Sequence, residues 1–166
     1  MPKMIVNGTN DPYWAQDALN LYWDDLIGPK YISYVPNAGH NLEEKLPDGT
    51  KSYDRAIGVL SGFAASMIHD HPMPKLSWKM DETKDGVGFQ VSSDPAPKAV
   101  RVWTAEAETR DFRKSTWSAM ELTTGQRVQT TVTKPKTGYR VGLVECDYEV
   151  EGVTYRLTTQ LQIVGK

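Results

Sequence analysis

Two residues near the N-terminus, Asp11 and His40, have side chains suited to acid–base chemistry. Asp11 lies in the turn-rich residues 7–12 (NGTNDP), and His40 ends the loop 36–40 (PNAGH). A carboxylate bonded to one imidazole nitrogen fixes the tautomer. The other nitrogen can then take a proton from a hydroxyl nucleophile and return it to a leaving group. The pair therefore predicts the acid and the base of a hydrolase triad.

Two strands must bring these residues together. Residues 3–6 (KMIV) and 31–35 (YISYV) are short, apolar, β-branched or aromatic runs, as in strands of a parallel sheet. Between them, apolar residues at intervals of three and four predict a helix from Pro12 to Leu26, ended by Gly28. A crossover of this kind makes the strands parallel and places both loops at one edge of the sheet.

Each residue also has a simpler explanation. An Asp before Pro12 is often only a helix cap, and a His after a strand is often only part of a loop. As a cap, Asp11 is expected to be ionised. Because the two residues follow consecutive parallel strands in the order acid then base, we favour a catalytic pair.

The chain contains no obvious nucleophile for this pair. The order serine, acid, histidine is that of α/β-hydrolases, whose serine lies in a G-x-S-x-G turn between a strand and a helix. The nearest approximation is residues 58–62 (GVLSG), which follow His40 and fall within a helix expected from Ser52 to Ile68. Ser61 is therefore not expected to be the nucleophile, and we predict that the nucleophile is absent from this chain.

Residues 4–14 (MIVNGTNDPYW) and 34–42 (YVPNAGHNL) resemble the C-terminal part of the PhoPQ-activated pathogenicity-related protein family. The resemblance implies a larger protein, secreted or in the cell envelope, with an α/β-hydrolase core followed by a β domain. Asp11 and His40 match the family's presumed acid and base. The serine, the oxyanion donors and any signal peptide would then lie upstream, and this chain would be about the last third.

The residues 71–74 (HPMP) mark the expected domain boundary, because two prolines block continuation of a helix. We predict an α/β-hydrolase fragment over residues 1–73 and a second domain over residues 74–166. The second part contains seven strand-like runs: 76–80, 88–92, 99–107, 116–122, 127–133, 139–150 and 153–164. Seven such runs predict an immunoglobulin-like or fibronectin-like β-sandwich, with alternation in residues 100–105 indicating one buried and one solvent-facing side.

Other motifs suggest weaker hypotheses about ligands. The residues 69–71 (HDH) lack the further donors that a metal site needs, so we expect no metal and no cofactor. Trp78, Trp103 and Trp117 are expected mostly in the core, with a carbohydrate or protein platform on the sandwich as the alternative. The charged residues 110–114 (RDFRK) are interpreted as a solvated connection.

Composition excludes several classes of partner. The 19 basic and 21 acidic side chains nearly cancel, so no nucleic-acid footprint is expected. The single Cys146 cannot form an intrachain disulfide and is expected to be a small buried residue. No apolar run approaches the length of a membrane span, and no signal peptide is recognisable.

Two functions from different classes remain. In the first, the chain is part of a serine hydrolase that acts on an ester, amide or peptide bond of an unknown small-molecule or peptide substrate. The chain alone is then expected to be inactive. In the alternative, the chain is a non-catalytic binding or structural module whose working part is the β-sandwich.

Overall fold

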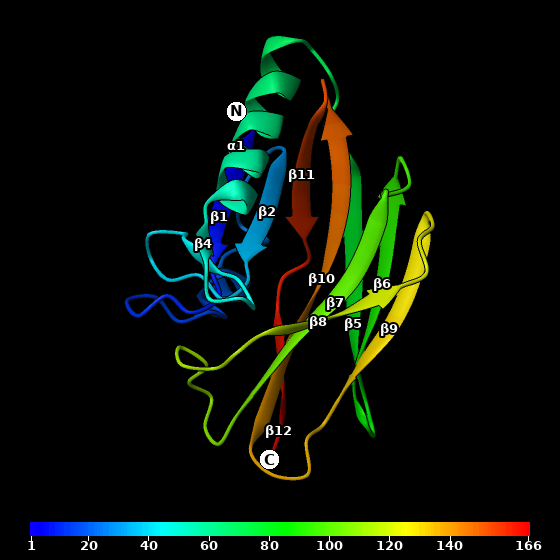
Figure 1. Ribbon diagram of the computed structural model, residues 1–166. Coiled ribbons are helices and arrows are strands. Elements are labelled where there is room, and N and C mark those ends of the chain that lie inside the picture. Colours follow the sequence, from blue (N-terminus) through cyan, green and yellow to red (C-terminus); the bar gives the residue numbers. More distant parts are fainter.

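The structure is a computed structural model that describes residues 1–166; it contains twelve β-strands and one α-helix (Figure 1). Strands β1 (Lys3–Gly8) and β2 (Lys30–Val35) pair in parallel, with Ile5 opposite Ile32. The predicted parallel pair is thus confirmed, and both strands end at one edge. A short antiparallel pair, β3 (Glu44–Lys45) and β4 (Lys51–Ser52), follows β2.

The helix predicted between Pro12 and Leu26 is wrong. Only one turn of 3-10 helix forms there, η1 (Ala18–Leu21). Leu19 and Trp23, one turn apart, are buried in a core cluster, whereas Leu21 is 87% exposed. The aromatic and Asn/Asp residues of this segment are weak helix formers, and burial of two anchors requires only a single turn.

Helix α1 (Asp54–Ile68) forms close to its predicted bounds and packs tightly on strand β11 (Val153–Thr158). A Cβ atom at Gly58 would lie 2.7 Å from the carbonyl oxygen of Thr154, and one at Gly62 would lie 2.6 Å from the Tyr155 ring. Gly58 and Gly62, the two glycines of the segment that approximates a nucleophile turn, therefore lie on the helix face that packs on β11. Their lack of a side chain permits this close packing.

The second half contains eight strands in two sheets, because the last predicted run divides into two strands. The three-stranded sheet has the order β5-β6-β9, and the five-stranded sheet has the order β11-β10-β7-β8 with β12 also paired to β10. The bounds of the strands not yet given are β5 (Lys75–Thr83), β6 (Gly86–Asp94), β7 (Ala99–Ala107), β8 (Ser118–Leu122), β9 (Arg127–Thr133), β10 (Tyr139–Val150) and β12 (Gln162–Gly165).

The break between β11 and β12 has a local cause. Thr159 donates its amide hydrogen to the carbonyl oxygen of Val144 at 2.9 Å, and its hydroxyl accepts from the Val144 amide at 3.1 Å. The side chain thus substitutes for a backbone partner in the ladder. Leu161, in the same connection, is fully buried.

Both faces of the five-stranded sheet are covered. Val100, Val102 and Val144 belong to a cluster shared with β6 and β9, so the two sheets face each other. Trp103 and Ala105 belong to a second cluster with η1 and the β7–β8 loop. The prediction that one side of residues 100–105 faces solvent is therefore wrong, because the N-terminal segment covers the side that carries Trp103 and Ala105.

The N-terminal strands lie against the larger sheet. Strand β2 runs beside β11 (Figure 1), and the Tyr34 amide donates to the Thr158 hydroxyl at 3.2 Å. Val59 of α1 and Met73 join the core cluster between the two sheets. None of the helices has the length and hydrophobicity of a membrane-spanning segment.

Candidate functional site

Asp11 and His40 lie in hydrogen-bond contact at the ends of β1 and β2. His40 Nδ1 is 2.8 Å from Asp11 Oδ2. The side chain of Asp11 is 11% exposed, and that of His40 is 57% exposed. The structure therefore brings together the two residues that the sequence singled out. The carboxylate of Asp11 is buried, and the imidazole of His40 is exposed to solvent.

Backbone amides hold the Asp11 carboxylate. Asp11 Oδ1 accepts from the Tyr13 amide at 2.8 Å and from the Trp14 amide at 3.4 Å. The predicted capping chemistry of Asp11 is thus present, although no α-helix follows it. Burial raises the pKa of Asp11, but the bonds from the Tyr13 amide and from His40 outweigh burial and lower that pKa.

The charge on Asp11 decides which nitrogen of His40 carries the proton. An ionised carboxylate only accepts hydrogen bonds, so Nδ1 of neutral His40 is the donor. The Nε2 atom then carries the lone pair, and it makes no hydrogen bond within the chain. The Tyr13 ring packs edge-on against the imidazole at a centroid distance of 5.0 Å and leaves the ring accessible. The arrangement suits a general base.

Two asparagines anchor the site loops to the loop between β7 and β8. Asn10 Nδ2 donates to the carbonyl oxygens of Arg113 at 3.1 Å and Ser115 at 2.7 Å. Asn37 pairs in both directions with the backbone of Trp117. Residues more than 70 positions away in sequence thus fix the loops that carry Asp11 and His40.

No hydroxyl or thiol side chain of the chain bonds to His40. Ser61 lies within α1 on its exposed surface. Cys146 is 1% exposed, as predicted, and burial raises its pKa to about 12. The pair is therefore a base and its orienting acid without a nucleophile among their contacts.

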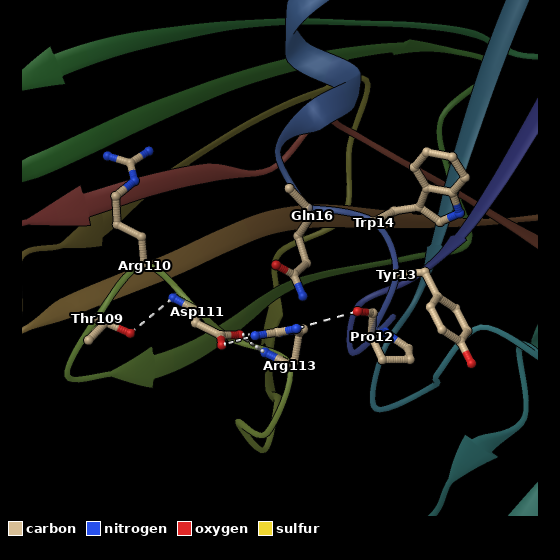
Figure 2. A pocket seen from close by; sticks show the side chains of 9 residues that line it. Pro12, Tyr13, Trp14, Gln16, Thr109, Arg110, Asp111 and Arg113 are labelled. Carbon is tan, nitrogen blue, oxygen red and sulfur yellow. Dashed lines mark hydrogen bonds and ion pairs between the residues drawn. The ribbon is translucent and has the colours of Figure 1, made fainter.

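The four charged residues of the run 110–114 are exposed, as predicted for a solvated connection, but the aromatic residue among them is not. Phe112 at their centre is fully buried, and the flanking Asp111 and Arg113 line a cavity opposite residues 12–16 (Figure 2). The signal in the sequence is the single aromatic residue within a charged run. It anchors the loop, so that its neighbours on either side face the cavity.

A buried ionic network, also missed in the sequence, supports the larger sheet. Glu145 of β10 is fully buried and accepts hydrogen bonds from Arg55 of α1, from Arg101 at 2.6 Å and from Trp103 Nε1 at 3.1 Å. The Arg55 guanidinium also lies over the Trp103 ring, 5.1 Å from its centroid. Three separate elements thus meet at one carboxylate.

The network reaches the His40 loop. Arg55 pairs with Glu44 of β3 at 2.8 Å, and Glu44 forms a β-bridge with Ala38, two residues before His40. Desolvation by burial raises the pKa of Glu44, against the lowering influence of Arg55. The ionic network therefore supports the backbone that presents the imidazole.

The other candidate ligand groups do not converge on a site. No group of three or more His, Cys, Asp or Glu side chains could hold a metal ion. His71 instead pairs with Glu151 at 2.6 Å. Trp103 and Trp117 are buried, and Trp78 is partly buried against both core clusters, which confirms the prediction that most of these tryptophans pack in the core.

The fold and the site define a mostly β protein in which a parallel strand pair carries an aspartate–histidine pair. The sequence model of the family described as PhoPQ-activated pathogenicity-related protein matches residues 1–113. The chain belongs to this family, and the matched residues include Asp11 and His40. No curated protein and no solved structure matches the chain.

Proposed function

We propose that His40 and Asp11 are the base and the orienting acid of a hydrolase that cleaves an ester, amide or peptide bond. The observation that carries this proposal is the 2.8 Å contact between His40 Nδ1 and Asp11 Oδ2 at the ends of two parallel strands. Ligands of parallel sheets bind at this edge. Membership of the family supports the proposal without defining the reaction.

In the proposed reaction, His40 Nε2 takes the proton of a hydroxyl nucleophile while the hydroxyl oxygen attacks the substrate carbonyl carbon. The tetrahedral intermediate collapses as Nε2 gives that proton to the leaving group. Water then repeats both steps on the acyl-enzyme, which restores the hydroxyl and releases the acid. Asp11 stays ionised throughout and stabilises the imidazolium that forms twice in each cycle.

The nucleophile in this proposal comes from a segment other than residues 1–166. Residues 1–73 then correspond to the end of an α/β-hydrolase domain, and residues 74–166 to an immunoglobulin-like sandwich, in a secreted or cell-envelope protein. The anchoring of both site loops by Asn10 and Asn37 gives the second part a role as scaffold.

A serine-directed fluorophosphonate probe tests the proposal on the natural polypeptide isolated from its source. We expect labelling of that polypeptide, loss of labelling in His40→Ala, and no labelling of the 166-residue chain alone. His71→Ala is the matched control, because His71 is also exposed and also pairs with a carboxylate. Labelling of His40→Ala at the rate of the unaltered protein would exclude His40 as the base.

A further inference from the structure

The cavity beside the Asp11–His40 pair has a volume of about 470 Å³, within the range of small-molecule sites. Its two walls are residues 12–16 and residues 109–113 (Figure 2). Trp14 and Gln16 also line a small hollow that they share with Asp11. The inner wall of the cavity therefore backs onto the candidate acid.

One buried donor in this cavity has no partner. Gln16 is 8% exposed, and its Nε2 atom makes no hydrogen bond. Figure 2 shows its side chain reaching into the space between Pro12 and the Asp111–Arg113 wall. A buried amide nitrogen without a partner costs free energy, so a rotation of the Gln16 side chain that lets Nε2 donate to an acceptor in the cavity is favoured.

The opposite wall also offers donors rather than acceptors. Arg113 Nε donates to Asp111 Oδ1 at 2.8 Å, and Arg113 Nη2 donates to Asp111 Oδ2 at 2.6 Å. These bonds lower the pKa of Asp111 to about 2, so the carboxylate stays ionised and both of its oxygens are used. The carboxylate thereby orients the guanidinium, whose Nη1 makes only a 3.4 Å contact with the Pro12 carbonyl oxygen.

The backbone on both sides is fixed in the free protein. The buried Tyr34 hydroxyl donates to the Gln16 carbonyl oxygen at 2.9 Å, and Asn10 holds the Arg113 carbonyl oxygen at 3.1 Å. Phe112 is fully buried between the two charged residues. The backbone that carries both donors is thus fixed before any ligand arrives, which lowers the entropic cost of binding.

We propose that this cavity binds a carboxylate group, with Gln16 Nε2 and the Arg113 guanidinium as its donors. Of the charged lining residues, Arg110 already pairs with Asp17 at 3.3 Å. The Arg113 guanidinium, held by Asp111, is therefore the cation that a ligand meets, and its single charge matches a monoanion. A planar guanidinium fork suits a carboxylate in particular. The consequence for the substrate rests on the proposed function: the hydrolase would act on an ester, amide or peptide that carries a carboxylate. Binding itself is measured without any reaction.

The test uses two probes on the whole chain, hippurate and its uncharged analogue hippuramide, followed by NMR of the Gln16 side-chain amide. We expect hippurate to shift the Gln16 resonances and to bind at least about tenfold more tightly than hippuramide, as loss of one charge-assisted bond predicts. Equal binding of the two probes, or no shift at Gln16, would overturn the proposal. Tighter binding of phenyl phosphate than of hippurate would also contradict it, because the site would then be one for dianions.

Three variants test the two donors, and the first of them separates binding from stability. Gln16→Leu should weaken hippurate binding about tenfold without lowering the thermal midpoint, because the amide nitrogen has no partner to lose. A lower midpoint with unchanged binding would show that Gln16 is only structural. Arg113→Gln should weaken binding, whereas Arg127→Gln, which removes the same charge from an exposed residue outside the cavity, should not. If Arg113→Gln and Arg127→Gln weakened hippurate binding equally, the binding would be due to general electrostatic attraction and not to this cavity.

Discussion

Asn37 forms two hydrogen bonds with the backbone of Trp117 across 80 residues of sequence. Its Oδ1 accepts from the Trp117 amide at 2.7 Å, and its Nδ2 donates to the Trp117 carbonyl oxygen at 3.0 Å. The Asn37 side chain thus links the His40 loop to the β7–β8 loop through a pair of hydrogen bonds, as a paired strand residue would. Asn37 also has a φ of 55°, a conformation that asparagine tolerates better than most residues.

Asn37→Ala is expected to lower the free energy of unfolding by about 2–4 kcal/mol, because it leaves two backbone groups of a buried residue unpaired. Urea denaturation measures this loss. Asn41→Ala is the control, since Asn41 lies in the same loop and accepts only one exposed bond, from the Glu43 amide. An Asn37→Ala variant as stable as Asn41→Ala would show that the link to Trp117 does not hold the loop.

Asp11→Asn should make the free energy of unfolding less dependent on pH in the acid range. The pKa of Asp11 is lower in the folded state than in the unfolded state. The ionised group therefore stabilises the fold above its unfolded pKa of about 4, and this contribution disappears as the pH falls through the folded pKa. Asparagine keeps an acceptor for the Tyr13 amide but loses the charge.

Urea titrations of both proteins, at about pH 7 and about pH 3, measure this contribution. We expect the unaltered protein to exceed Asp11→Asn at neutral pH and the difference to shrink in acid. A difference that stays constant between the two pH values would contradict the assignment.

Glu145→Ala is expected to cost about 3–5 kcal/mol, because it leaves the Arg55 and Arg101 guanidinium groups without their buried counter-ion. Glu121→Ala is a matched control, since Glu121 also pairs with Arg101, at 3.0 Å, but is 69% exposed. Its loss should cost less than about 1 kcal/mol. If the denaturation midpoints fell equally in both variants, the contribution of Glu145 to stability would not depend on its burial.

Gly62→Ala should destabilise the protein, although the same change usually favours a helix by about 1 kcal/mol. The new methyl group would lie 2.6 Å from the Tyr155 ring, so we expect a net loss of about 1–3 kcal/mol in thermal unfolding. Ser61→Ala, at the adjacent exposed position, should change stability by less than about 0.5 kcal/mol. A higher thermal midpoint for Gly62→Ala than for Ser61→Ala would contradict the close packing of α1 on β11.

The sequence by itself determined the features whose causes are local. Short apolar runs that end in turn residues identify β1 and β2, and their order places Asp11 and His40 at one edge. Periodicity identifies α1, and runs bounded by turn residues match β7, β9 and β10 at both ends. In each case the pattern within one segment is enough, because the period of the side chains follows from the backbone conformation.

The tertiary structure alone decided what each segment packs against. Residues 12–26 have a helical pattern, yet only η1 forms, because Leu19 and Trp23 are drawn into a cluster with β7 and the β7–β8 loop. The buried Glu145 network and the cavity beside Gln16 join residues from distant parts of the chain. Burial and pairing of this kind depend on long-range contacts, which no pattern within a single segment encodes.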